Sequence, residues 1–260
     1  YPRAPRAYLY CDNMDIIGAP FVILERRKGI VVRYKIPEVF RSYDGIEERL
    51  SRALVIAQTD LHKVDFEKAG LDQLGSAEGF LKRQVAGWFK RWSLSSKNED
   101  PVMSEIIEQL KKSIPDTQMQ VIIHNDFKLD NCQFDSDNPD EVKSVFDWDM
   151  ATIGDPLFDF ASSLVYWQDS FFDDYDIPVL LAGHFPDKAV LKDIYFEEMS
   201  LKQDDFEWYE AFAFWKTAVI ARQLFNRYQS GDTKDKRLAK FGNVASAFAD
   251  KALKILKQKG

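Results

Sequence analysis

The sequence of 260 residues contains little of what several common protein classes require. It has only two cysteines, Cys11 and Cys132, which stand far apart and form no CxxC motif, so we expect neither a disulfide framework nor a zinc site. Its three histidines are well separated, which argues against a hydrolase with a histidine-rich metal centre. No apolar run approaches the roughly 20 residues of a membrane helix, and no signal peptide is visible. We therefore expect a cytoplasmic protein without membrane insertion.

An excess of positive charge is also lacking. The formal net charge is -7, which argues against a general nucleic-acid binder because such proteins need a basic face. Hydrophobic residues make up 45% of the chain, enough for one large domain or two coupled lobes with a substantial core. The sequence does not indicate an oligomeric state.

The hydrophobic pattern changes along the chain. Residues 1–35 contain short apolar runs around a turn region from Asn13 to Gly18, which predicts β-structure. From Gly45 the apolar residues repeat with a helical period, and the predicted helix ends near His62. A second helical face is formed by Leu81, Val85, Trp88 and Trp92.

Capping and turn residues delimit the later elements. Asp100 before Pro101 predicts a helix start, and Asp155 before Pro156 predicts another. Between them, the runs "QVIIH", "CQFD" and "SVFDWD" predict short strands, the last two joined by the turn-rich "SDNPDE". After Pro156 we expect only helices, including a long aromatic one that acids cap at its start near residues 204–205. This order predicts a mainly helical α+β fold.

The segment "VIIHNDFKLDNCQF" (121–134) places polar residues directly after an apolar strand. Asp126 and Asn131 share one short loop, and the predicted hairpin then returns the chain to Asp147. A catalytic Asp, an Asn a few residues later and a metal-binding Asp beyond a hairpin are the parts of a phosphoryl-transfer site. Carboxylate and amide oxygens suit Mg²⁺. The alternative is that these residues are only polar turns at strand ends.

"HNDFKLDN" followed by "FDWDMATIGDPLFDFA" resembles the aminoglycoside phosphotransferase and choline kinase family, which has a two-lobed, protein-kinase-like fold. The branch it resembles most is the kinase-like domain fused to some acyl-CoA dehydrogenases. The segments "LHKVDFEKAGLDQLG", "EGFLKRQVAGW" and "YEAFAFWKTAVIARQLFNRY" extend the resemblance over nearly the whole chain. Asn125 departs from the glycine usual in that loop, although Asn tolerates unusual backbone angles better than most residues.

The resemblance implies a role for each residue of the motif. Asp126 resembles the catalytic base, and Asn131 and Asp147 resemble the Mg²⁺ ligands. His124 resembles the histidine that braces the catalytic loop, and Lys128 stands where a basic residue touches the transferred phosphate.

Asp159 resembles a buried acid that hydrogen-bonds the catalytic loop. A buried carboxylate needs donors, and the loop amides would supply them. His62 and His184 are expected to be incidental to the site.

"FVILERRKG" resembles the hinge strand that meets the nucleotide base, so Glu25 and Arg27 are expected to flank ATP or GTP. We therefore expect residues 1–28 to be the remainder of a β-rich N-lobe with the hinge strand, and residues 29–260 to be the helical C-lobe. The phosphate-covering loop, the lysine and the glutamate of such kinases should precede Tyr1. The start at Tyr1 leads us to expect that an upstream segment is missing from this numbering.

For the acceptor, Trp208, Tyr209, Lys216 and Arg222 on the long aromatic helix are candidate contacts, the alternative being core packing. The acidic run "DSFFDDYD" (169–176) could instead hold a cationic acceptor, or it could be a solvated loop.

The function expected is ATP- and Mg²⁺-dependent phosphorylation of a small-molecule hydroxyl, on a hydroxylated metabolite or hydroxyacyl compound rather than an antibiotic. The alternative is a nucleotide-binding pseudokinase or regulatory module that transfers nothing.

Overall fold

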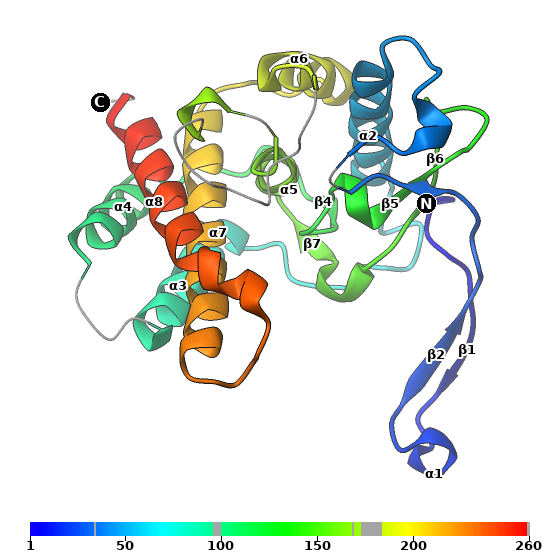
Figure 1. The fold of residues 1–260 in the computed structure, drawn as a ribbon, viewed down its shortest axis with the longest axis horizontal. Helices are drawn as coiled ribbons and strands as arrows, with labels where there is room; N and C mark the ends of the chain where they lie inside the picture. Colours follow the sequence, from blue (N-terminus) through cyan, green and yellow to red (C-terminus); the bar gives the residue numbers. More distant parts are fainter. Residues whose placement is uncertain (34, 96–99, 168, 173–183, 259–260) are drawn as a thin grey trace.

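The computed structural model describes residues 1–33, 35–95, 100–167, 169–172 and 184–258, and its fold is α+β and mainly helical, as predicted (Figure 1). None of the described helices is long and apolar enough to cross a membrane. The principal helices are α2 Ile46–His62, α3 Phe80–Ser95, α4 Pro101–Lys112, α5 Pro156–Leu164, α6 Lys188–Met199, α7 Phe206–Gln229 and α8 Phe241–Gln258. The strands are β1 Ala7–Cys11, β2 Phe21–Leu24, β3 Ile30–Val31, β4 Val121–Ile123, β5 Cys132–Phe134, β6 Val142–Val145 and β7 Thr152–Gly154.

The strands form three small antiparallel sheets in the described part of the chain. β1 pairs with β2, β5 lies between β3 and β6, and β4 pairs with β7. The predicted hairpin of β5 and β6 is confirmed, with Cys132 opposite Val145. β7 was not predicted; it is a three-residue strand that pairs with β4 directly before α5. The loop from His124 to Asn131 joins β4 to β5, and Asp147 follows β6, so two of the sheets position these residues.

The helical body is built around α7, which packs along α8 and against α5 and α3 (Figure 1). Large aromatic side chains of α7 fill this core, among them Phe212 and Trp215. The predicted face of α3 is confirmed, because Leu81, Val85 and Trp88 are all buried. α2 spans the predicted range, begins after a left-handed Gly45 and ends at His62.

Two of the three predicted acidic caps are confirmed. The Asp100 carboxylate accepts from the backbone N–H of Val102 at 3.1 Å, and the Asp155 carboxylate accepts from Leu157 N–H at 2.8 Å. The acids expected at the start of α7 are there, Asp205 at the N-cap position and Glu207 in the first turn, but they supply no side-chain cap. Asp205 precedes that helix in the left-handed region, with φ 61°, and its side chain makes no capping hydrogen bond, whereas capping side chains normally need an extended backbone.

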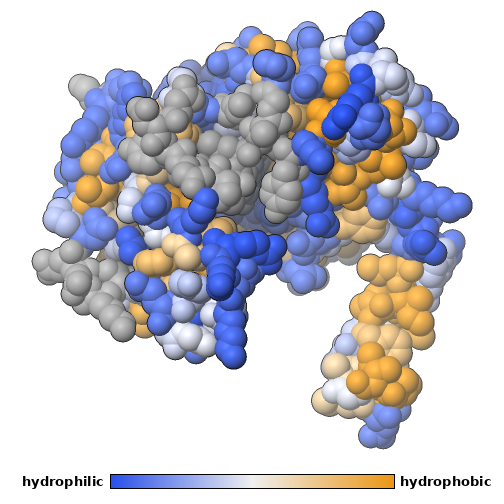
Figure 2. Space-filling view, viewed as in Figure 1, coloured by the Kyte–Doolittle hydropathy of each residue, from blue (hydrophilic) through white to orange (hydrophobic). Residues whose placement is uncertain are grey.

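The β1–β2 ribbon projects from the helical body, with the short helix α1 (Met14–Ile17) at its tip (Figure 1). Many of its apolar side chains are exposed, and they form the orange arm in Figure 2. Those exposed side chains are Tyr8, Leu9, Tyr10, Met14, Ile16, Ile17, Val22, Ile23 and Leu24. A two-stranded ribbon is marginally stable by itself, so this arm is the kind of element that other strands normally cover.

Candidate active site

The loop after β4 carries the predicted catalytic motif and ends in a 3₁₀ turn at Leu129–Asn131, directly before β5. The β5–β6 hairpin then brings the chain back to this turn. Phe146 donates its backbone N–H to Asn131 O at 2.9 Å, so Asp147 follows a residue that is tied to Asn131. The structure thus brings Asp126, Asn131 and Asp147 to one place, as the sequence spacing indicated.

The Asp126 carboxylate is held from two sides within its own loop. Lys128 Nζ lies 2.8 Å from Asp126 Oδ2 in an ion pair, and Asn131 Nδ2 donates to the same oxygen at 3.0 Å. Asn131 Nδ2 also donates to the backbone carbonyl of Asp126 at 2.8 Å. About a quarter of each side chain in the ion pair is exposed, so the carboxylate is oriented but remains accessible to a substrate.

Asn125 takes the left-handed backbone conformation, with φ 68°, that the usual glycine of this loop would adopt. Its N–H donates to Asp159 Oδ1 at 2.6 Å, and its Nδ2 donates to Met150 O at 2.8 Å. The expectation that Asn is tolerated here is confirmed, since both the backbone and the amide group have partners.

Asp159 is fully buried on α5 and accepts hydrogen bonds from several directions. Its Oδ2 accepts from the backbone N–H of His124 at 3.1 Å, and it also accepts from Gln58 Nε2 at 3.1 Å and His62 Nε2 at 3.0 Å. Burial alone would raise the pKa of Asp159, but the hydrogen bond and charge of His62, with the His124 contacts, lower the pKa to about 2. The expected support of the catalytic loop is therefore present in the structure.

The expectation that His62 is incidental was wrong. His62 is buried at the end of α2, where its Nδ1 meets Tyr195 Oη at 2.7 Å and its Nε2 meets Asp159. Gln58, one turn earlier on α2, was also missed. A polar residue on the apolar face of a predicted helix was the available signal, but its partner lies 97 positions away in the sequence.

His124 links the two halves of the site. Its Nε2 lies 2.8 Å from Phe146 O, and the Asp126 N–H donates to its Nδ1 at 3.3 Å. Because a carbonyl only accepts, the ring carries its proton on Nε2. His124 is also buried against the Trp148 ring, at a centroid distance of 4.9 Å, so it braces the loop rather than facing solvent.

The residues predicted to hold Mg²⁺ fit that ion. Asp147 is exposed in a left-handed conformation, with φ 66°, and makes no hydrogen bond or ion pair with another described residue. Asn131 uses its Nδ2 on Asp126, which leaves its amide oxygen for a ligand. Within the described ranges, no group of three His, Cys, Asp or Glu could hold a metal. Mg²⁺ needs no such group, because it commonly takes one or two protein ligands together with phosphate oxygens.

Glu25 and Arg27 lie at the base of the ribbon and contact each other and the first residues of the chain. Arg27 Nε lies 2.9 Å from Glu25 Oε2, and the Arg27 guanidinium donates to Pro2 O at 3.1 Å. The Glu25 N–H also pairs with Arg6 O at 2.7 Å. These contacts connect the first residues of the chain to the segment that follows β2. The part of Glu25 and Arg27 in nucleotide binding stays a prediction.

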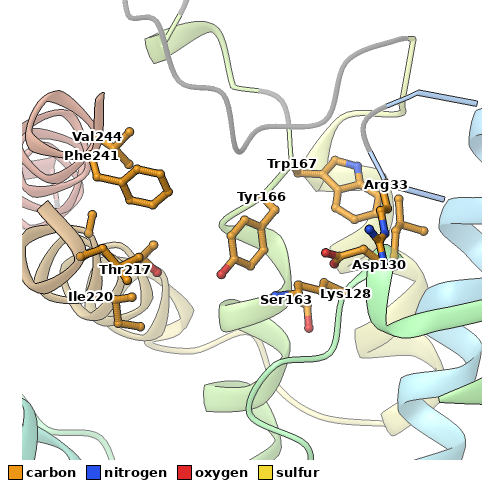
Figure 3. A pocket seen from close by; sticks show the side chains of 13 residues that line it. Arg33, Lys128, Asp130, Ser163, Tyr166, Trp167, Thr217, Ile220, Phe241 and Val244 are labelled. Carbon is orange, nitrogen blue, oxygen red and sulfur yellow. The ribbon is translucent and has the colours of Figure 1, made fainter. Parts of the chain in front are cut away.

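A cavity of about 300 Å³ opens beside the catalytic loop. Figure 3 shows Arg33, Lys128 and Asp130 on one side and side chains of α7 and α8 on the other, with Tyr166 between them. The apolar wall is formed by Ile220, Ala221, Leu224, Phe241 and Val244. The cavity therefore combines a charged end next to Asp126 with a hydrocarbon-like wall.

The predicted acceptor residues do not line this cavity. Trp208 and Tyr209 are buried in the core, where Trp208 Nε1 donates to Leu110 O and Tyr209 Oη donates to Asp155 Oδ2, each at 3.0 Å. Lys216 and Arg222 are also absent from its lining. Other residues of α7 border the cavity, among them Thr217, Ile220 and Leu224, and the part of the four predicted residues in acceptor binding stays a prediction. Of the acidic run, residues 173–176 lie outside the described residues.

The loop geometry and the layout of strands and helices are those of a phosphotransferase with a protein-kinase-like fold. The family model described as "Phosphotransferase enzyme family" matches residues 2–194. The chain therefore belongs to the phosphotransferase enzyme family, as the motif resemblance indicated.

Two curated relatives match nearly the whole chain. The chain is 30% identical to mouse acyl-CoA dehydrogenase family member 10 over 96% of its length, and 29% identical to rat acyl-CoA dehydrogenase family member 11 over 96%. It spans 24% of the first and 33% of the second, about a quarter to a third of these relatives.

Two solved structures share the fold. A Ralstonia eutropha JMP134 protein, provisionally assigned to the aminoglycoside phosphotransferases, superposes with TM-score 0.85 at 24% identity, covering 99% of this chain and 79% of that one. A Plasmodium vivax ethanolamine kinase superposes with TM-score 0.58 at 12% identity, covering 99% and 70%.

Proposed function

We propose that this protein transfers the terminal phosphoryl group of ATP or GTP, with Mg²⁺, to a hydroxyl group of a small molecule. The observation that carries the proposal is the arrangement of the loop after β4, where Lys128 and Asn131 orient the accessible carboxylate of Asp126 and the hairpin places Asp147 beside Asn131. The family assignment supports the reaction class, since the matching model describes phosphotransferases.

In this proposal Asp126 orients the acceptor hydroxyl and takes its proton as the hydroxyl oxygen bonds to the terminal phosphorus and the bond to the bridging oxygen of the nucleotide breaks. Asn131 and Asp147 would hold Mg²⁺, which supplies positive charge to the phosphate oxygens. Lys128 places a cation between Asp126 and the cavity, where the transferred group would pass. Positioning and electrostatics of this kind contribute most of the catalysis in phosphoryl transfer.

The cavity supports an acceptor with a hydrocarbon segment. Its wall of Ile220, Leu224 and Phe241 offers apolar surface but few hydrogen-bonding groups, and its polar end carries Arg33 and Lys128 together with Asp130. A polycationic aminoglycoside would leave ammonium groups against the apolar wall without acidic partners, whereas a hydroxylated acid or hydroxyacyl compound would place its chain on that wall and its acid or carbonyl group beside Arg33 and Lys128. The relatives with a dehydrogenase name are compatible with an acyl substrate, but that name describes them only.

We further propose that residues 1–28 are the last hairpin and hinge of a β-rich N-lobe, and that residues 29–260 are the helical C-lobe. The exposed apolar side chains of the β1–β2 ribbon support this division, because a sheet in a larger lobe would cover them.

Acceptor-dependent ADP release by the complete natural protein, measured with Mg²⁺ and a panel of acceptors, tests this function. The panel contains hydroxy acids of graded chain length, their acyl thioesters, choline-like alcohols and aminoglycosides. We expect release with the hydroxy acids or thioesters, and a rate that rises with chain length until the cavity of about 300 Å³ is filled. Mg²⁺-dependent nucleotide binding without release from any acceptor would favour the pseudokinase alternative, and release only with aminoglycosides would reject the acceptor class.

The metal assignment gives a separate prediction. Asp147→Asn should weaken binding of the Mg²⁺–nucleotide complex by at least roughly 10–100-fold, the loss typical even of residues that only support a metal ligand. Calorimetric titration with and without Mg²⁺ measures it. Asp149→Asn is the matched control. Asp149 is exposed in the 3₁₀ turn that directly follows Asp147, and its substitution removes the same charge. Equal losses in both variants would mean that general electrostatics, not coordination by Asp147, explains the effect.

A further inference from the structure

Lys216 is a lysine buried in the middle of α7, with only 5% of its surface exposed. Its Nζ lies 5.0 Å from the centre of the Phe158 ring and 5.8 Å from that of Trp88. Among the ion pairs of the described residues, none involves Lys216. Burying an ammonium group is costly unless it is paired, so its location calls for a specific contact.

That contact is with the back of the catalytic loop. Lys216 Nζ donates to the carbonyl of Asn125 at 3.4 Å and to Ser162 Oγ at 3.5 Å. The same peptide group is held at its other end, because the N–H of Asp126 donates to His124 Nδ1 at 3.3 Å. Both polar atoms of the peptide between Asn125 and Asp126 therefore have a partner, one from α7 and one from His124.

This peptide is a sensitive point of the loop. Asn125 is left-handed, a conformation that costs a non-glycine residue energy and persists only where the surroundings enforce it. The peptide also sets the direction in which Asp126 leaves the backbone. A rotation of the peptide would move the carboxylate away from the partners that now orient it, Lys128 and Asn131.

We propose that Lys216 is a positioning residue for Asp126, acting from behind the loop by fixing the peptide between Asn125 and Asp126. The proposal rests on the proposed function in so far as Asp126 is the catalytic carboxylate. It replaces the sequence-based expectation that Lys216 touches the acceptor, since Lys216 is absent from the cavity lining.

The charge of Lys216 gives this contact a pH dependence. Burial lowers the pKa of Lys216 to about 8, although the carboxylates of Asp159 on α5 and Asp126 on the loop raise it and the guanidinium of Arg91 on α3 lowers it. The ammonium form predominates below pH 8 and is lost as the pH rises through that value. The hold on Asn125 should weaken over the same interval, so turnover should fall on the alkaline side.

The kinetic test compares Lys216→Met and Lys216→Arg with the natural protein, and thermal unfolding checks that each variant is folded. We expect Lys216→Met to lower kcat by roughly 100-fold, the typical cost of a small misplacement of a catalytic group, with both KM values nearly unchanged. The fall of kcat near pH 8 that we expect for the natural protein should be absent from Lys216→Met. Lys216→Arg should recover part of kcat and move the decline above pH 10, because arginine stays protonated there.

Lys188→Met is the matched control. Lys188 is another mostly buried lysine, but it lies on α6 and pairs with Asp169 at 3.1 Å, apart from the catalytic loop. Its loss should leave kcat and the pH profile unchanged. A rise in the acceptor KM alone in Lys216→Met would overturn the proposal in favour of an acceptor contact, and an unchanged kcat would overturn it outright.

A second measurement does not depend on turnover or on a folded variant. In the natural protein, NMR titration of the lysine 13Cε resonances and of the Asp126 backbone amide should give one common midpoint near pH 8. An Asp126 amide that does not respond when Lys216 titrates would overturn the proposal. If no acceptor is turned over, the kinetic arm fails with the proposed function, whereas this arm still decides whether Lys216 holds the peptide.

Discussion

Replacing Asp126 with alanine should lower the rate of phosphoryl transfer by about 10²–10⁴-fold, the usual contribution of a positioned proton acceptor, while nucleotide binding stays nearly unchanged. The substitution removes the carboxylate that Lys128 contacts at 2.8 Å. The loop itself should persist. Asn131 Nδ2 can still donate to the backbone carbonyl of residue 126, a contact of 2.8 Å in the natural protein, and the backbone N–H groups of His124 and Asn125 can still donate to Asp159. Single-turnover kinetics and calorimetric nucleotide binding measure the two effects separately.

Two comparisons sharpen this result. Asp126→Asn keeps the size of the side chain and its hydrogen bonding but cannot accept a proton, so it should be nearly as slow as the alanine variant. Asp137→Asn removes an exposed carboxylate from the β5–β6 turn and should be as fast as the natural protein. Full activity in Asp126→Ala would show that another group accepts the proton.

Asp159→Asn should destabilise the whole fold by about 3–5 kcal/mol, the range found when one partner of a buried, paired charge is removed. The buried carboxylate accepts from Asn125 N–H at 2.6 Å, from His124 N–H at 3.1 Å and from His62 Nε2 at 3.0 Å. An amide group cannot accept all of these bonds, and its NH₂ would face other donors. Urea unfolding of the two proteins measures the difference, with Asp60→Asn as a control that breaks the partly exposed ion pair with Arg3.

The same carboxylate predicts how stability depends on pH. Its pKa in the folded protein is lowered to about 2 from the ordinary value of 3.8, so its stabilising contribution is present above pH 3.8 and is lost as the pH falls towards 2. A difference of this size is worth about 2 kcal/mol. The unfolding free energy of the natural protein should fall by that amount over this interval, and Asp159→Asn should lack that part of the slope. Parallel curves would show that Asp159 is not responsible.

Local signals in the sequence predicted much of this structure. The helix at Ile46–His62 follows from apolar residues at helical spacing, and the cap at Asp100 follows from its position before Pro101. The catalytic loop could be located because its residues lie close together in the sequence and a hairpin returns the chain to them. Each of these features depends on neighbours only a few positions apart.

The features that were missed depend on distant parts of the chain. The partnership of His62 with Asp159 joins two helices that only the tertiary fold brings together. Strand β7 has three residues and exists because β4 is available to pair with it. The side of α7 that borders the cavity could not be predicted for a similar reason: buried residues between Phe206 and Ala221 fall on all sides of the helix, so its periodicity does not separate the cavity face from the core.

The hydrogen bonds accepted by Asp159 also couple motions of the catalytic loop to motions of the helical body. The backbone N–H groups of His124 and Asn125 donate to the Asp159 carboxylate, which also accepts hydrogen bonds from Gln58 and His62 on α2. Full disorder of the catalytic loop would break these buried hydrogen bonds, so we expect it to accompany separation of the helices that form the body. Such a site should lose its geometry in the same cooperative transition in which the fold melts, and cold or heat adaptation of this enzyme class would have to act on the helical body rather than on the loop.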